Sequence, residues 1–215
     1  MYNHWDLTLQ LLFDLYRYSR DNLHEVLCVD NGSTEEEVRG GGEWWSKQKL
    51  LPLSVLRLNK NLGFSEASNI GLGTAIGDIK ILISNDVQAR SAFIPKIVDR
   101  LSFPKIIVGG VLRNYNTGWN VFGDRMFPYL EGWLLAATSQ AWSEIGGFDL
   151  RFSPYDYEDV DFSTTALEKG YVLSPLDDPG LIHMGGQTIG YSDARVLQTN
   201  INRSKFEEKW IKKSM

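Results

Sequence analysis

Three acidic positions in this sequence could carry chemistry. Asp30 follows the apolar run EVLCV, Asp86 follows the run IKILI closely, and the segment YEDVD contains Glu158 and Asp159. A carboxylate at the end of a strand can accept hydrogen bonds from a base or a ribose hydroxyl, or it can bind a divalent metal ion. A carboxylate ahead of a helix can instead cap that helix, so each acid taken alone leaves both interpretations open.

The elements that must position these acids follow an α/β pattern. Apolar residues three or four apart, and short apolar runs between polar turns, predict alternating elements. We predict helices at residues 6–19, 64–76, 91–101 and 193–213, and strands at 24–29, 54–59, 79–83 and 105–111. Repeated strand and helix units predict a mainly parallel sheet flanked by helices, in which ligands bind beyond the carboxyl ends of the strands.

Three local patterns give further expectations. Ser33 and Glu36 have the spacing of a capping box that begins a helix. The glycine-rich segment RGGGEWW at 39–45 predicts a flexible surface loop. Residues 113–129, rich in Asn, Gly and aromatic side chains, predict an irregular hairpin or a mobile loop.

Composition narrows the class of protein. With 215 residues and 43% hydrophobic content, the chain can form one large domain. The net charge of −5 leaves no broad basic field, which argues against nucleic acid as a partner. The single cysteine, Cys28, lies in an apolar run and is expected in the core. No segment of ~20 apolar residues and no signal peptide is present, so we expect a cytoplasmic protein.

Six motifs in a fixed order resemble the family 2 glycosyltransferases, which have the GT-A fold. They are VDNGSTE (29–35), NKNLGFSEASNIGLGTAIGD (59–78), ISNDV (83–87), GGFDLRF (146–152), YEDVDF (157–162) and HMGGQT (183–188). The branch that they resemble most is rhamnosyltransferase-like. The resemblance implies a single GT-A domain over residues 1–215, with a nucleotide-binding part at about 1–110, an acceptor and catalytic part at about 111–190, and a C-terminal helix at about 193–213.

The resemblance implies a nucleotide-sugar donor, linked to UDP, dTDP or GDP. Asp30 matches the position that contacts the nucleotide base. The positions assigned to the donor are Asp30, Asn31, Gly32, Ser33, Asn59, Gly63, Asn69 and Asn85.

The resemblance also implies a divalent metal ion. Asp86 matches the last acid of the family's DxD-type motif, whereas Ser84 stands at the position of the first acid. His183 matches a position where the family often has a histidine that contacts metal or diphosphate. Because Ser84 replaces the first acid, the protein offers few ligands for a metal ion. We therefore expect Mg²⁺ or Mn²⁺ to be held jointly with the donor phosphates.

Asp159 matches the catalytic base of the family, with Glu158 as the alternative. An inverting transfer needs one carboxylate that takes the proton of the acceptor hydroxyl while its oxygen attacks the sugar. Asp161 is expected to cap the helix or to face the core. Gly132 and Trp133 match the acceptor-side loop. Trp119 and Trp133 have two interpretations, because aromatic rings either stack on sugars or pack in a core.

These matches predict an inverting glycosyltransferase that moves a single sugar to a hydroxyl of a glycan or lipid-linked acceptor, in polysaccharide biosynthesis. The alternative is a catalytically decayed module that binds a nucleotide-sugar or a carbohydrate. The segment KFEEKWIKKSM at 205–215 is either a solvated helix or a peripheral contact at the inner face of a membrane.

One part of the family pattern is missing. Family members begin with an apolar strand ahead of the segment that Tyr2 and Asn3 resemble, and this sequence begins after it. We therefore expect the sheet to lack its usual first strand and to leave backbone groups unpaired at its centre. Either the start was assigned too late, or another segment or chain fills the place, or the chain is a degenerate relative.

Overall fold

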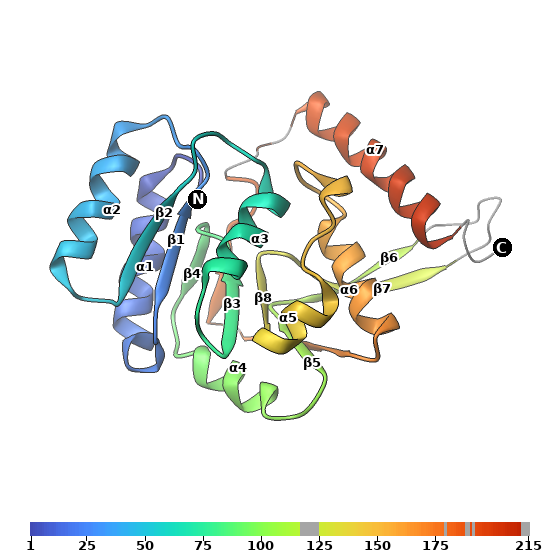
Figure 1. Cartoon of the computed structure of the whole chain (residues 1–215), viewed down its shortest axis with the longest axis horizontal. Coiled ribbons are helices and arrows are strands. Elements are labelled where there is room, and N and C mark those ends of the chain that lie inside the picture. The colour runs from blue at the N-terminus through green and yellow to red at the C-terminus, as the bar shows by residue number, and fades with distance from the viewer. Residues whose placement is uncertain (117–124, 179, 188–189, 191, 212–215) are drawn as a thin grey trace.

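A computed structural model describes residues 1–116, 125–178, 180–187, 190 and 192–211 (Figure 1). The helices are α1 (Trp5–Ser19), α2 (Glu36–Gln48), α3 (Phe64–Thr74), α4 (Ile94–Leu101), α5 (Ser139–Ile145), α6 (Glu158–Glu168) and α7 (Asp193–Trp210), with short 3₁₀ turns at Arg20–Asn22 and Leu150–Phe152. The strands are β1 (Val26–Asp30), β2 (Leu53–Arg57), β3 (Ile79–Ile83), β4 (Val87–Ala89), β5 (Ile106–Gly109), β6 (Leu112–Asn116), β7 (Met126–Leu130), β8 (Leu134–Thr138), β9 (Val172–Pro175) and β10 (Leu181–His183).

The strands form two main groups. β1 pairs with β2 in parallel, and a four-stranded group has the order β3-β8-β5-β9. In this second group β5 and β9 are parallel, and β8 runs antiparallel between β3 and β5. The α/β class with helices flanking the sheet is therefore confirmed, with β8 as an antiparallel addition.

β1 and β3 are not hydrogen-bonded neighbours in the described part of the chain. The open edge of β1 instead meets the first residue, because the amino group of Met1 donates to the carbonyl of Val29 at 2.7 Å. Asn31 N–H in turn donates to the carbonyl of Met1 at 2.8 Å. The two groups of strands are joined by side-chain packing.

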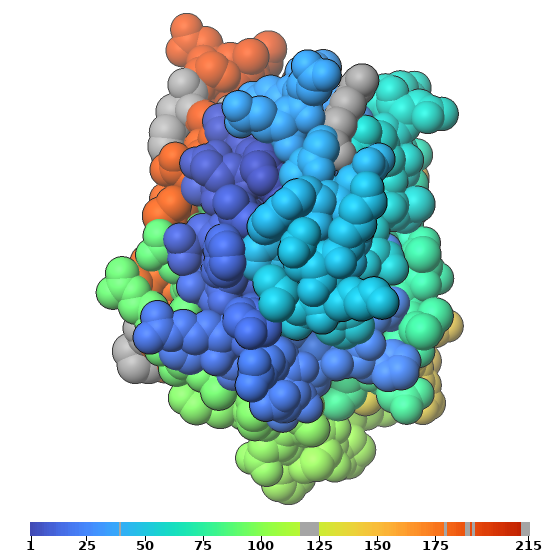
Figure 2. Space-filling view, turned by 90° about the vertical axis from the view of Figure 1, so that its left-hand side faces the viewer, coloured from blue at the N-terminus to red at the C-terminus, as the bar shows by residue number. Residues whose placement is uncertain are grey.

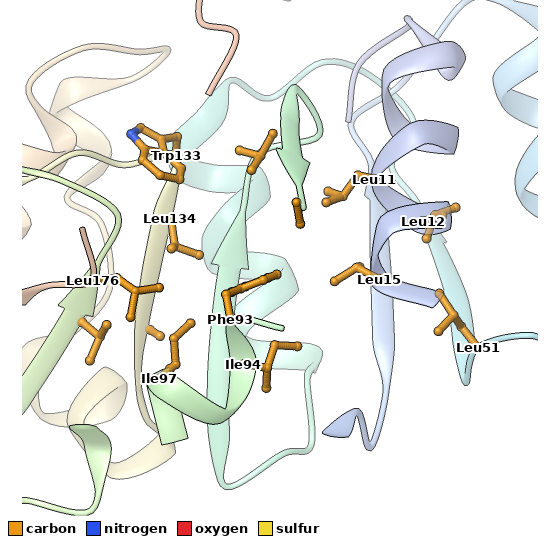
Figure 3. Close-up of a cluster of buried hydrophobic side chains, with 14 of the residues drawn as sticks. Leu11, Leu12, Leu15, Leu51, Phe93, Ile94, Ile97, Trp133, Leu134 and Leu176 are labelled. Atoms are coloured by element: carbon orange, nitrogen blue, oxygen red, sulfur yellow. The ribbon is translucent and has the colours of Figure 1, made fainter. Parts of the chain in front are cut away.

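The largest core cluster connects the two groups of strands. Leu11 and Leu15 of α1 point toward Phe93 and Ile94 (Figure 3), and all four side chains are buried. On the outside, α1 and α2 form most of the face that Figure 2 shows, in dark and lighter blue. A second cluster packs α5 and α6 against β8, and a third joins Phe152 and Val160 to Phe206 of α7.

The prediction of a loop at residues 39–45 is wrong, because this segment is the middle of α2. Tertiary packing overrides the low helix propensity of glycine. Val38 and Trp45 of this helix are fully buried. A Cβ added at Gly41 would lie 2.1 Å from the Trp5 ring, and one at Gly42 would lie 3.0 Å from Val55. The glycines therefore let α2 approach its neighbours closely.

The predicted capping box is also wrong. α2 begins at Glu36 after Glu35, and no side chain caps it. The Ser33 hydroxyl instead accepts a hydrogen bond from the backbone N–H of Asn3 at 2.8 Å. A partner thirty residues away in sequence replaces the local partner, so Ser33 fixes the entry to α1.

The remaining local predictions fall partly within the described residues. The segment 113–129 forms the antiparallel pair β6 and β7, while its centre, including Trp119, lies outside the described residues. The predicted helix at 193–213 is α7 up to Trp210, and residues 212 and 213 lie outside the description. Among the described helices, none has the length and apolar character needed to cross a membrane.

Candidate active site

A large cavity lies where β1 and β3 end. It has a volume of about 1920 Å³ and extends from the loops after these strands into the space between them. Most of the predicted site residues line it: Asn31, Gly63, Asn85, Asp86, Gly132, Trp133, Glu158, Asp159 and His183. Asp30, Gly32, Ser33, Asn59 and Asn69 are not among the residues that line it.

Asp159 lies in the first turn of α6 and faces the loop between β7 and β8. Its Oδ2 accepts a hydrogen bond from Gly132 N–H at 3.1 Å, and its Oδ1 accepts one from Val160 N–H at 2.8 Å. Burial raises the pKa of Asp159 to about 6, although the two backbone donors oppose this shift. The side chain is thus fixed in orientation and changes charge in the range that suits a general base.

Glu158 is the neighbouring buried acid. Burial raises its pKa well above the usual value, and the nearby charge of Asp159 raises it further. Among the described residues, Glu158 Oε2 has no hydrogen-bond partner. Two adjacent buried carboxyl groups do not both ionise readily, so the raised pKa of Glu158 favours its protonated form beside an ionised Asp159.

The turn that presents these two acids has an unusual backbone. Asp156 and Tyr157 have φ values of 69° and 75°, the left-handed region that non-glycine residues rarely adopt. Asp156 is fixed there by Arg195, with an ion pair of 3.0 Å, and by the hydroxyl of Thr199 at 2.6 Å. Both partners belong to α7, so this helix fixes the turn.

Sequence reasoning did not identify Asp156, Arg195 and Thr199 as part of the site. The acid lies 39 and 43 residues from its two partners, and a single sequence carries no signal that links them. The left-handed turn gave no signal either, because neither Asp156 nor Tyr157 is a glycine.

A second group of side chains lies at the end of β3. Asp86 is buried, and its Oδ1 lies 3.4 Å from His183 Nε2. β10 brings His183 there by pairing antiparallel with β4. The His183 ring stacks on Trp133, with ring centres 5.2 Å apart and planes at 18°. Trp133 is fixed by the hydrogen bond of its ring N–H to Glu131 at 2.8 Å.

This second group could hold a divalent ion together with a ligand. Within the described residues, no three His, Cys, Asp or Glu side chains converge as metal ligands. Asp86 and His183 supply one oxygen and one nitrogen donor. Mg²⁺ is commonly bound by one or two protein carboxylates and by substrate phosphates, so this donor set fits a metal shared with a diphosphate.

The loop after β1 is closely packed and hydrogen-bonded to the start of α3. Asn31 donates to the carbonyl of Gly63 at 3.1 Å and accepts from Leu62 N–H at 2.9 Å, so it joins this loop to the start of α3. A Cβ at Gly32 would lie 2.3 Å from the backbone of Lys60. Asp30 is fully buried, accepts from Ser33 N–H at 2.9 Å, and forms an ion pair of 3.0 Å with Arg57.

Three predicted asparagines lie in different surroundings. Asn85 lines the cavity and donates to the Thr8 hydroxyl at 3.1 Å. Asn69 exchanges two hydrogen bonds of 2.8 Å with the backbone of Phe148, which joins α3 to the Gly-Gly turn. Asn59 is exposed in the loop after β2.

Asp161 anchors α7 to α6. It is buried and lies 2.7 Å from Lys209 Nζ, and it also accepts a hydrogen bond from the Trp210 ring N–H at 2.7 Å. The carboxylate therefore has a structural role at the far end of the helix that also holds Asp156.

Comparisons with curated proteins give two relatives of one kind. The undecaprenyl-phosphate 4-deoxy-4-formamido-L-arabinose transferase of Enterobacter sp. (strain 638) is 26% identical over 123 residues, 57% of this chain and 37% of the relative. The protein of the same name from Klebsiella pneumoniae (strain 342) is 30% identical over 91 residues, 42% of this chain and 28% of the relative. The chain thus covers about a third of these proteins.

Solved structures with a similar fold include a mannosyltransferase. The mannosyltransferase PcManGT from Pyrobaculum calidifontis, in complex with GDP-Man and Mn²⁺, has a TM-score of 0.66 and 22% identity over 81% of this chain and 52% of its own. The S. aureus TarS structure in complex with UDP-GlcNAc has a TM-score of 0.60 and 18% identity over 89% of this chain and 60% of its own. The GT-A fold is therefore confirmed. Residues 1–167 match the family described as glycosyl transferase family 2, and the chain belongs to this family.

Proposed function

We propose that this glycosyltransferase is an inverting, metal-dependent enzyme that transfers a single sugar from a nucleotide-sugar to a hydroxyl of a glycan or lipid-linked acceptor. The observation that carries the proposal is Asp159, a buried carboxylate on the cavity wall, fixed by two backbone N–H groups and titrating near pH 6. Such a group is ionised at neutral pH and is oriented to accept a proton.

In the proposed reaction, Asp159 takes the proton of the acceptor hydroxyl as that oxygen attacks the anomeric carbon. Glu158 stays protonated, because burial and the neighbouring charge both disfavour its ionised form. The loop at Gly132 and Trp133 faces the acceptor and holds Asp159 in one orientation through the Gly132 N–H.

Asp86 and His183 would hold the divalent ion, with Asn85 beside them. When bound, Mg²⁺ or Mn²⁺ neutralises charge on the departing diphosphate. The Mn²⁺ in the PcManGT structure supports a metal ion in this fold.

The nucleotide is assigned to the part of the chain at about 1–110, beside Asn31 and Gly63. Asp30, Gly32 and Ser33 hold the shape of this loop, and Asn59 and Asn69 remain proposed donor positions. The GDP and UDP donors of the neighbouring structures support a nucleotide-sugar here. The name of the curated relatives, undecaprenyl-phosphate transferase, supports a lipid-linked acceptor.

The test is release of nucleoside diphosphate from a panel of UDP-, dTDP- and GDP-sugars, with and without Mn²⁺. We compare the wild type with Asp159→Asn and use Asp99→Asn, an exposed acid on α4, as the matched control. The proposal requires that turnover is lost in Asp159→Asn and kept in Asp99→Asn. Full turnover of Asp159→Asn would remove the base assignment.

A non-catalytic module that binds a nucleotide-sugar is the second candidate. Two observations favour it: Ser84 stands where the family pattern has an acid, and no group of three metal ligands converges in the described residues. Donor binding in calorimetry without turnover on any acceptor would select this candidate. The rhamnosyltransferase-like branch, the division of the chain into parts and a cytoplasmic location with peripheral membrane contact remain predictions.

A further inference from the structure

The loop between β7 and β8 has three consecutive residues that contact different parts of the site. Gly132 N–H donates to Asp159 Oδ2 at 3.1 Å. The carbonyl of Trp133 accepts a hydrogen bond from Ser84 N–H at 2.8 Å, in the loop after β3. The first residue of the three, Glu131, accepts hydrogen bonds from two side chains and lines the same cavity. The proposed function gives this acid no role.

The carboxylate of Glu131 holds the ring of Trp133. Its Oε2 accepts the ring N–H at 2.8 Å, and the negative charge strengthens this hydrogen bond. Trp133 is only 7% exposed, and Figure 3 shows its ring nitrogen directed away from the other labelled side chains of the core cluster. Without this acceptor the ring would lose its hydrogen bond or turn to find another partner.

The Trp133 ring in turn holds His183. The two rings stack, with centres 5.2 Å apart and planes at 18°. His183 Nε2 lies 3.4 Å from Asp86 Oδ1, a distance beyond the usual range of a strong hydrogen bond. The His183 side chain is 31% exposed. The stack on Trp133 is therefore a main constraint on the orientation of the imidazole beside Asp86.

The second partner of Glu131 lies on the solvent side. Arg113 of β6 donates from Nε to Glu131 Oε1 at 3.0 Å, and the Arg113 side chain is 58% exposed. Exposed ion pairs of this kind contribute little to stability. The backbone N–H of Glu131 donates to the carbonyl of Val111 at 3.1 Å, which does not involve the side chain. Replacement of the Glu131 side chain should therefore leave the loop folded and release the Trp133 ring.

We propose that Glu131 is a positioning residue of the site. Its carboxylate orients the Trp133 ring through the ring N–H, and this ring keeps His183 beside Asp86. Because Gly132 of the same loop holds Asp159, one loop then orients both the proposed base and the proposed metal ligand. The inference rests on the proposed function where it concerns the donor and the metal ion, but the contacts between the side chains exist without either.

The first measurement requires neither activity nor a metal ion. The chain has three histidines, and the ring current of Trp133 displaces the NMR signal of the one stacked on it. We label histidine with ¹³C and assign the signal with His183→Gln. We expect the displacement to be lost in Glu131→Ala and kept in Glu131→Gln, because glutamine retains an oxygen acceptor for the ring N–H.

An unchanged signal in Glu131→Ala would overturn the proposal. The packing of the Trp133 ring would then be enough to hold it, since a Cβ at Gly110 would lie only 2.1 Å from this ring. Arg113→Ala is the matched control, because it removes the other partner of Glu131 and leaves the hydrogen bond to Trp133. We expect its signal to match that of the wild type. The same loss in Arg113→Ala as in Glu131→Ala would also overturn the proposal.

The second measurement is calorimetry of donor binding with and without Mn²⁺, with the UDP-, dTDP- and GDP-sugars as probes. We expect Glu131→Ala to weaken binding in Mn²⁺ by about tenfold and Glu131→Gln by about threefold or less, with metal-free binding unchanged. Trp133→Phe keeps an aromatic ring without the N–H and should cause a loss similar to that of Glu131→Ala. It tests the same hydrogen bond even if Glu131→Ala does not fold.

The double variant shows whether Glu131 acts through Trp133. Once Trp133→Phe has removed the ring N–H, Glu131→Ala should cause no further loss of donor binding. Additive losses, or wild-type binding in Trp133→Phe, would overturn the proposal. If the wild type binds no donor of the panel, the proposed function fails, and the signal of His183 still decides whether Glu131 positions that ring.

Discussion

At the scale of single residues, the adjacent acids Glu158 and Asp159 differ in what surrounds their carboxyl groups. Asp159 is held by two backbone N–H donors, whereas Glu158 has an oxygen without a partner in the described residues. Donors stabilise a carboxylate and burial favours the protonated acid. The carboxyl group of Asp159 is therefore the one of the two that ionises more readily.

This difference predicts that two amide substitutions lower kcat to very different extents. Glu158→Gln resembles the protonated side chain, so we expect kcat to stay within about tenfold of the wild type. Asp159→Asn removes the proton acceptor, and we expect kcat to fall by about 10²-fold or more. Steady-state release of nucleoside diphosphate measures both. The reverse order of effects would make Glu158 the base.

The raised pKa of Asp159 predicts a pH dependence of both activity and stability. Activity should fall as the pH drops through about 6, because the base becomes protonated. The folded state binds this proton more tightly than the unfolded state, where the pKa is near 3.8. The contribution of Asp159 to stability therefore decreases as the pH rises from about 4 to about 6.

Asp159→Asn cannot ionise and serves as the control for that stability effect. We expect the Tm of Asp159→Asn relative to the wild type to increase from about pH 4 to about pH 7, whatever its value at pH 4. Thermal melts at several pH values measure this difference. A difference that is independent of pH would show that Asp159 titrates normally.

His183 should matter only where a metal ion is present. It contacts Asp86 at 3.4 Å and stacks on Trp133, so it is held beside the acid. We expect His183→Ala to weaken donor binding by about tenfold or more in Mn²⁺ and to leave metal-free binding unchanged. Calorimetry with and without Mn²⁺ measures both, with the exposed His24→Ala as the control. An unchanged Mn²⁺ dependence would remove His183 from the metal site.

At the scale of elements, α2 is held by close contacts at its glycines. Gly40 and Gly41 are neighbours in the same helix, but a Cβ at Gly41 would overlap the Trp5 ring at 2.1 Å, and one at Gly40 would meet nothing within 4 Å. The two positions therefore separate packing from helix propensity.

We predict opposite signs for alanine at these two glycines. Gly40→Ala should stabilise the protein by about 0.5–1 kcal/mol, because alanine favours the helix. Gly41→Ala should destabilise it by about 1–3 kcal/mol, because the methyl group displaces Trp5. Urea unfolding measures both. Stabilisation by Gly41→Ala would show that α1 and α2 are loosely packed.

A comparison of α2 with β1 and β3 shows which elements a single sequence can predict. β1 and β3 are predicted because each is a short apolar run that ends at polar residues, a local pattern. A helix is expected to begin near Glu36, but the middle of α2 is not predicted, because the contact of Gly41 with Trp5 joins residues far apart in sequence. The role of Ser33 is missed for the same reason, since its partner Asn3 belongs to another segment.

At the scale of the whole molecule, α7 holds two acids of the segment that presents the site, one near each of its ends. Arg195 and Thr199 hold Asp156, and Lys209 and Trp210 hold Asp161 at the other end of the helix. The acids could be found from sequence because they stand in motifs. The helix contacts could not, because they depend on how the end of the chain packs against residues 152–161.

Between these two anchors, Asn202 of α7 contacts the turn that presents Asp159. It is fully buried, and its amide donates to the carbonyl groups of Phe152, Tyr155 and Asp156 at 2.6, 2.8 and 3.0 Å. Those carbonyl groups belong to the segment that ends in the left-handed residues ahead of α6. Without the amide these carbonyl groups, the first buried and the other two partly buried, would lose this partner, and an unpaired buried polar group costs about 1–3 kcal/mol.

We therefore predict that Asn202→Ala lowers both stability and kcat. The unpaired carbonyl groups should reduce the free energy of unfolding by about 2–3 kcal/mol. The loosened turn should lower kcat by about tenfold or more, because displacing Asp159 by a fraction of an ångström weakens proton transfer. Asn200→Ala, at an exposed position of the same helix, is the matched control and should change neither. If Asn202→Ala lost stability but kept its kcat, α7 would support the fold without positioning the base.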